Sequence, residues 1–142
     1  MDIYDRTSAL PATEVSPARS PRILVIDDDR HVRTLLCDLL EAWGYAADAA
    51  EDGRQGLALF DRGGYDMVLT DFGMPGISGL DVVAGVRDRD TEVSVIMFTA
   101  FTGDLEADGR RLGFTILRKP VDIEALRRAV RAAVEARGTM AG

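Results

Sequence analysis

The chain has 142 residues and a formal net charge of −7, and 46% of its residues are hydrophobic. These values favour a single globular domain with a substantial core, and the negative charge argues against a nucleic-acid-binding surface, which needs clustered Lys and Arg. Because Cys37 is the only cysteine, neither an internal disulfide nor a zinc cluster can be built from it.

The sequence shows no membrane or export signal. No stretch is as long as a transmembrane helix, and the N-terminus bears Asp2 and Asp5 without an apolar segment. We therefore expect a cytoplasmic protein that binds no membrane. Residues 1–21 are expected to form a flexible leader, residues 22–137 a folded domain and residues 138–142 a flexible tail.

From residue 22 onward, short apolar runs alternate with helical patterns. In chain order the patterns predict a strand at 22–26, a helix over 32–43, a weaker strand at 45–50, a helix over 53–62, a strand at 66–70, a helix over 79–88, a strand at 93–99, a short polar helix over 103–112, a strand at 114–117 and a last helix. Asp29 and Asp122 are the expected N-caps of the first and last helices.

Five strands that alternate with five helices predict an α/β fold with a parallel sheet and right-handed crossovers. The runs 23–26 and 95–98 are apolar on both faces, as in a doubly wound sheet that helices cover on both sides. In such a fold, ligands bind at the carboxyl ends of the strands.

Polar residues gather at those strand ends. Asp27 and Asp28 follow the first strand, Asp71 ends the third, Thr99 ends the fourth and Lys119 follows the fifth. We therefore expect three carboxylates, a hydroxyl and an ammonium group in one pocket.

This set of groups favours phosphoryl chemistry. Three close carboxylates repel one another, and Mg²⁺, which prefers oxygen ligands, removes that cost. Asp71 is then the expected nucleophile that forms an acyl phosphate, while Lys119 and Thr99 bind phosphoryl oxygens. Lys119 is also the only lysine among 17 basic residues, as expected where a compact point charge is needed and a guanidinium is too broad.

The motifs that carry these residues resemble those of the receiver domains of two-component response regulators. The matching segments are Ile23–Asp29, Asp66–Asp71, Met74–Gly76 followed by Gly79, Val95–Ala100 and Arg118–Pro120. The resemblance spans about residues 22–137 and implies a flavodoxin-like (βα)5 fold with strand order 2-1-3-4-5. Since the chain ends soon after the fifth helix, we expect a stand-alone receiver without an output domain.

The resemblance also implies individual roles. Asp71 is similar to the phosphoacceptor, and Asp28, Asp71 and the backbone carbonyl of Gly73 to the Mg²⁺ ligands, with Asp27 assisting through water. Thr99 resembles the switch hydroxyl and Lys119 the phosphate-binding lysine, and the Lys119–Pro120 bond is expected to be cis. Ala100 matches the small residue beside the phosphoryl group.

Three features depart from the family pattern. The family often has Tyr or Phe where this chain has Ile116, the segment between Thr99 and Lys119 is about two residues short, and Gly73 offers no side chain. These departures leave the expected chemistry intact but put the usual output mechanism in doubt.

The implied partners are proteins. A histidine kinase or histidine phosphotransferase is the expected phosphoryl donor, because His31, the only histidine, is expected to be an exposed surface residue. A downstream protein is expected to read the conformational change, and the chain to be a monomer or weak dimer. No enzymatic activity is expected beyond assistance to its own phosphorylation and dephosphorylation.

Two alternatives remain open. A phosphatase of the haloacid dehalogenase type would use Asp27 and Asp29 as its Asp-x-Asp pair and Thr99 and Lys119 as its later motifs, but Asp122 and Glu124 fit its downstream acidic pair poorly. A degenerate receiver would bind partners without phosphorylation, and the intact aspartates argue against it.

Overall fold

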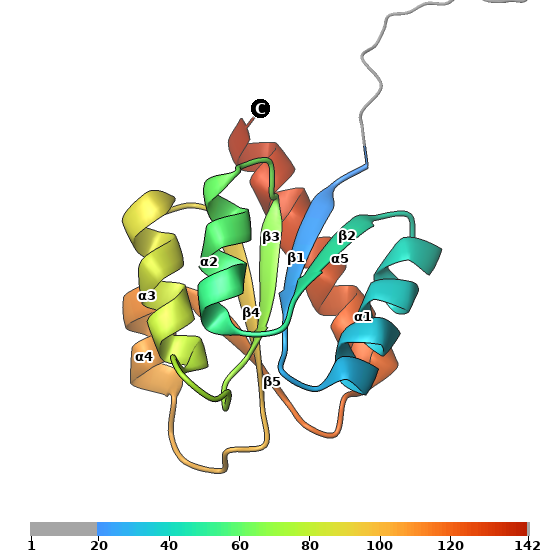
Figure 1. Ribbon diagram of the computed structural model, residues 1–142. Coiled ribbons are helices and arrows are strands. Elements are labelled where there is room, and N and C mark those ends of the chain that lie inside the picture. Colours follow the sequence, from blue (N-terminus) through green and yellow to red (C-terminus); the bar gives the residue numbers. More distant parts are fainter. Residues whose placement is uncertain (1–19, 142) are drawn as a thin grey trace, which may run out of the picture.

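The computed structural model describes residues 20–141 and shows a five-stranded parallel sheet between two layers of helices (Figure 1). The strands are β1 (Arg22–Ile26), β2 (Ala46–Ala50), β3 (Met67–Asp71), β4 (Ser94–Thr99) and β5 (Phe114–Arg118). The helices are α1 (Arg30–Ala42), α2 (Gly53–Asp61), α3 (Gly79–Arg89), α4 (Glu106–Leu112) and α5 (Ile123–Ala141). The strand order is β2-β1-β3-β4-β5, which confirms the expected doubly wound (βα)5 fold.

Each face of the sheet has its own core. On one face, Leu36 and Leu40 of α1 and Leu126 and Val130 of α5 pack on the sheet. On the other face, residues of α2 and α3 cover the sheet together with the end of the loop before α4, and include Phe60, Val82, Val83, Val86 and Leu105. Burial on both faces explains why β1 and β4 have continuous apolar runs rather than alternating ones.

The helix starts follow local signals. The Asp29 carboxylate accepts hydrogen bonds from the backbone N–H groups of His31 and Val32, so Asp29 caps α1 as expected. The Asp122 carboxylate accepts from Glu124 and Ala125 at the start of α5 in the same way. His31 is exposed, also as expected.

The fourth helix was predicted too long. It begins at Glu106, not at Gly103, and Gly103 lies in the preceding loop. A Cβ atom at Gly103 would lie 2.2 Å from the Phe101 ring, so that ring packs directly on the Gly103 backbone. This packing and the Asp104 carboxylate, which accepts from the Glu106 N–H group at 2.8 Å, keep residues 103–105 out of the helix.

The structure differs from the expected domain limits at the C-terminal end of the domain. α5 extends to Ala141, so residues 138–141, expected as a tail, are helical, and the boundary expected at residue 137 falls inside this helix. The leader expected at 1–21 lies outside the described residues up to residue 19. No helix in the described part of the chain is both long and apolar enough to cross a membrane.

Candidate functional site

The carboxyl ends of the strands bring three carboxylates together. The oxygen atoms of Asp27, Asp28 and Asp71 that could bind a metal ion all lie within 4.8 Å of one another. Asp27 and Asp28 follow β1, and Asp71 is the last residue of β3, which pairs with β1. The strand pairing, not sequence proximity, therefore creates this acidic cluster.

Asp71 lies at the centre of the site with one carboxylate oxygen occupied. Its Oδ1 atom accepts the Phe72 N–H group at 3.0 Å and the Lys119 Nζ atom at 2.9 Å. Among the described residues no hydrogen-bond donor reaches its Oδ2 atom. The Asp71 side chain is 8% exposed, so its second oxygen is sheltered but carries no hydrogen bond from these residues.

Lys119 is held opposite Asp71 by the end of β5. Its backbone N–H group donates to the Thr99 carbonyl at 2.9 Å, and its bond to Pro120 is cis, as expected. Burial lowers the pKa of Lys119, but its hydrogen bond to Asp71 and the attraction of the nearby carboxylates outweigh this effect and raise the pKa overall. Lys119 is therefore a cation held within the site.

Asp27 provides a buried oxygen without a partner. Its side chain is almost fully buried, and its Oδ1 atom accepts the Asp29 N–H group at 2.8 Å. Its Oδ2 atom is the one buried side-chain N or O atom in the described residues that has no hydrogen bond. Burial, with a further contribution from the Asp71 charge, raises the pKa of Asp27 to about 6. An unpaired buried carboxylate oxygen costs free energy unless a cation binds it, so the residues present fit a hard divalent ion.

Thr99 is buried at the end of β4, with 1% of its surface exposed. Its Oγ atom accepts the Phe101 N–H group at 2.8 Å, which fixes the hydroxyl position and leaves the hydroxyl hydrogen available as a donor. Ala100 and Gly73 are exposed beside the site, and nothing lies within 4 Å of where a Gly73 Cβ would be. The expected role of the Gly73 carbonyl stays a prediction.

Two aspartates of the alternative phosphatase interpretation are used elsewhere. Asp29 caps α1 and is absent from the carboxylate cluster, and Asp122 caps α5. The Asp-x-Asp pair and the downstream acidic pair of that alternative therefore find no support in this geometry.

Phe72 and Arg118 also shape the site, although no sequence motif predicted this for either residue. Phe72 and Phe101 stack with ring centroids 5.3 Å apart, and Arg118 donates to the carbonyl groups of Phe101 and Gly103. The positions of Phe72 next to Asp71 and of Arg118 next to Lys119 were the available signal, since both lie at the same sheet edge.

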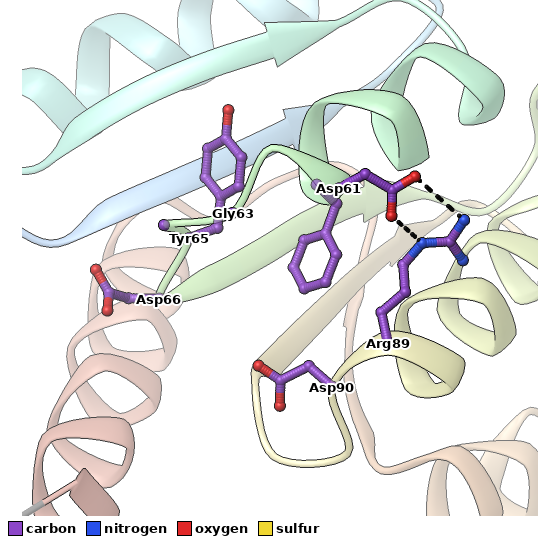
Figure 2. A pocket seen from close by; sticks show the side chains of 8 residues that line it. Asp61, Gly63, Tyr65, Asp66, Arg89 and Asp90 are labelled. Atoms are coloured by element: carbon purple, nitrogen blue, oxygen red, sulfur yellow. Dashed lines mark hydrogen bonds and ion pairs between the residues drawn. The ribbon is translucent and has the colours of Figure 1, made fainter.

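Hollows lie at both ends of the sheet. One of about 490 Å³ opens beside Asp28, and its lining includes Arg54, Pro75 and Ile77. A second, of about 360 Å³, lies where α2 leads into β3 and α3 into β4, and the Arg89–Asp61 ion pair borders it (Figure 2). The second hollow lies at the amino ends of the strands and contains none of the expected site residues.

A family model described as the response regulator receiver domain matches residues 23–131. The chain belongs to this receiver domain family. The receiver is 33% identical over 113 residues to sporulation initiation phosphotransferase F of Bacillus subtilis (strain 168), an alignment that covers 78% of this chain and 90% of that protein. It is 34% identical over 119 residues to the uncharacterized transcriptional regulatory protein YkoG of the same organism, with 82% of this chain and 52% of that protein covered. The chain thus spans about half the length of YkoG.

Solved structures agree with this assignment. The response regulator TrrA from Thermotoga maritima in complex with Mg(2+)-BeF is 34% identical to this receiver, with a TM-score of 0.72 and coverage of 80% of this chain and 98% of TrrA. A response regulator receiver domain protein from Clostridium thermocellum is 30% identical, with a TM-score of 0.79 and coverage of 84% and 98%. The receiver domain is a phosphorelay signalling domain, so the family assignment confirms the function class expected from the sequence.

Proposed function

We propose that this receiver domain accepts a phosphoryl group on Asp71 with Mg²⁺ bound by Asp28, Asp71 and the backbone carbonyl of Gly73, and that Asp27 assists metal binding through water. The observation that carries the proposal is the cluster of three carboxylates, with an unpartnered buried oxygen on Asp27 and hydrogen bonds to only the Oδ1 atom of Asp71. A Mg²⁺ ion there would neutralise the carboxylates and the charge of the transferred phosphoryl group.

The residues of the chain supply the rest of the reaction. The Asp71 Oδ2 atom attacks phosphorus, and the bond from phosphorus to the donor breaks with its electron pair leaving on the donor atom. Lys119 already lies 2.9 Å from the Oδ1 atom of Asp71, from where its ammonium reaches an oxygen of the bound phosphoryl group. The Thr99 hydroxyl donates to a second phosphoryl oxygen, and the small side chain of Ala100 leaves room beside it.

The phosphoryl donor is a histidine kinase or a histidine phosphotransferase. The exposed position of His31 on α1 supports a donor outside this chain, since His31 does not lie among the site residues. The hollow lined by Asp28 borders one carboxylate of the cluster and offers room for a donor group. The degenerate alternative, a receiver that binds partners without phosphorylation, is disfavoured because the nucleophile, the acidic cluster and Lys119 are all present in one site.

Intact mass spectrometry tests the proposal. Wild-type protein incubated with acetyl phosphate and Mg²⁺ should gain the mass of one phosphoryl group, and chelation of Mg²⁺ should abolish the gain. Asp71→Asn should gain nothing. Asp38→Asn, which changes an exposed carboxylate on α1, is the matched control and should be phosphorylated like the wild type. An Asp71→Asn protein that gains the same mass as the wild type would show that the acceptor is another residue.

We propose further that a protein partner reads the phosphorylated state at the face made by α4, β5 and α5. A groove of about 270 Å³ lies on this face, lined by Glu106, Gly109, Arg110, Phe114 and Ile116. Ile116 is half-buried against the core and presents no ring, so movement of the segment 103–112, which contains α4, is the expected signal. With beryllofluoride and Mg²⁺, backbone amide shifts should concentrate at residues 99–117. Shifts confined to the loops that bind the metal would place the output on another surface.

A further inference from the structure

The loop between β4 and α4, residues 100–105, directly follows Thr99 and is the lowest part of the molecule in Figure 1. It contains neither helix nor strand, so its conformation depends on contacts with the rest of the molecule. These contacts therefore decide where the loop lies relative to the Thr99 hydroxyl.

Arg118 makes the first of these contacts. It is the last residue of β5 and lies opposite Thr99 in the register of β4 and β5. Its guanidinium donates through one nitrogen to the Phe101 carbonyl and through the other to the Gly103 carbonyl, the latter at 3.4 Å. A guanidinium can bridge two acceptors in this way because its donors lie in a rigid fork, whereas a lysine at 118 would offer a point charge.

Phe101 links Arg118 to the Thr99 hydroxyl. The Phe101 N–H group donates to the Thr99 Oγ atom at 2.8 Å, while the Phe101 carbonyl is held by Arg118. A threonine hydroxyl otherwise chooses among staggered positions about its Cα–Cβ bond. The Phe101 N–H group selects one of them, and Arg118 keeps Phe101 in place to do so.

The Phe101 ring holds the loop from its other side. It stacks on Phe72 with an angle of 21° between the rings, and it packs on the Gly103 backbone. The Phe72 N–H group in turn donates to the Oδ1 atom of Asp71. The loop is therefore linked to both sides of the candidate phosphoryl site, through Thr99 and through Phe72.

We infer that Arg118 is a positioning residue for the Thr99 hydroxyl and acts on it through Phe101. This inference rests on the proposed function, because it concerns the hydroxyl that donates to the phosphoryl group. Arg118 does not touch that group itself. It holds the loop so that the Thr99 hydroxyl points one way before a phosphoryl group arrives, which lowers the cost of ordering the hydroxyl on binding.

The far end of α4 is held much more firmly. Arg87 of α3 donates to the carbonyl groups of Leu112, Gly113 and Val93 at 2.6, 2.8 and 2.7 Å, and its guanidinium is partly buried. Arg118 is exposed and one of its contacts is long. Removal of Arg118 should therefore loosen residues 100–105, which the Phe101 ring still contacts, and leave the end of α4 in place.

A double-mutant cycle on the affinity for beryllofluoride in Mg²⁺ tests the inference. Arg118→Ala should weaken binding about two- to threefold, because a less restrained hydroxyl divides among two or three staggered positions of which one is productive. In a Thr99→Ala background, Arg118→Ala should cause no further loss, since the hydroxyl that it positions is gone. Arg111→Ala removes an exposed positive charge of neighbouring α4 and should leave the affinity unchanged. Arg118→Lys, which retains one donor, should bind with an intermediate affinity.

Hydrogen exchange at the Phe101 amide provides a second readout that needs no ligand. Exchange should be faster in Arg118→Ala than in the wild type, while the Gly113 amide, at the end that Arg87 holds, should be unaffected. Equal losses of affinity from Arg118→Ala in the two backgrounds, or an unchanged Phe101 exchange rate, would overturn this inference alone. A wild-type protein that binds no beryllofluoride in Mg²⁺ and accepts no phosphoryl group would overturn the proposed function and the inference with it.

Discussion

Gly79, the first residue of α3, should tolerate no side chain. A Cβ atom there would lie 2.4 Å from the Asp71 carbonyl oxygen and 2.8 Å from the Phe72 Cα atom. Both are backbone atoms of the segment that carries the candidate phosphoacceptor, and the Gly79 N–H group already donates to the Phe72 carbonyl at 2.8 Å. An alanine at 79 must therefore displace α3 or the end of β3.

This clash should lower the free energy of unfolding. Overpacking a close contact costs about 1–3 kcal/mol, and more where only backbone can move. Replacement of glycine by alanine at a helical position returns up to about 1 kcal/mol through helix propensity. We expect Gly79→Ala to lower the free energy of unfolding by about 2 kcal/mol, and the melting temperature by about 5–10 °C for a domain of this size.

Gly73→Ala is the matched control, because nothing lies within 4 Å of the added methyl group. Its free energy of unfolding should stay within about 0.5 kcal/mol of the wild type. Both variants are melted with circular dichroism detection in a chelator, so that metal binding does not contribute. Equal melting temperatures for Gly79→Ala and Gly73→Ala would refute the reasoning that α3 is seated against the Asp71 backbone.

Three further outcomes are expected. Burial raises the pKa of Asp27 to about 6, so the folded state loses stability as the pH rises through that value and Asp27 ionises. In urea unfolding with a chelator present, Asp27→Asn should therefore be more stable than the wild type at pH 7.5 but not at pH 4. Lys119→Arg should slow phosphorylation by acetyl phosphate, since a broad guanidinium cannot replace an ammonium 2.9 Å from Asp71, and an unchanged rate would remove that argument. Arg87→Met should lower the free energy of unfolding by about 2–4 kcal/mol, because it leaves several partly buried carbonyl groups without a donor, and a urea midpoint equal to the wild type would contradict this.

Much of the fold could be predicted from local patterns. Continuous apolar runs predicted β1 and β4, and the acidic residues before the helical patterns predicted the caps at Asp29 and Asp122, because strand burial and capping act over a few neighbouring residues. Alternation of strands and helices then restricted the topology to a parallel sheet, which places the ends of β1, β3, β4 and β5 at one edge. Asp27, Asp28, Asp71, Thr99 and Lys119 could be placed together on that basis.

The start of α4 and the contacts around the site depended on the tertiary structure. Helical periodicity predicted a helix that begins at Gly103, but the Phe101 ring packs on Gly103 and the helix begins only at Glu106. The fit of Gly79 against Asp71 likewise involves a residue eight positions along the chain whose neighbourhood no local pattern describes.

The arginine contacts show the same limit. In the sequence, Arg87 and Arg118 look like ordinary charged residues, yet both bind backbone carbonyl groups 15 or more residues away. Arg118 binds carbonyl groups of the loop before α4, and Arg87 binds those of Leu112 and Gly113. Carbonyl acceptors are present at every residue and leave no mark in the sequence. The amino-acid sequence alone was therefore enough to predict the candidate site groups and the edge of the sheet at which they meet. Only the packing of distant segments decided how the Thr99 hydroxyl and the Asp71 backbone are held there, because those contacts depend on shapes that form after the sheet is assembled.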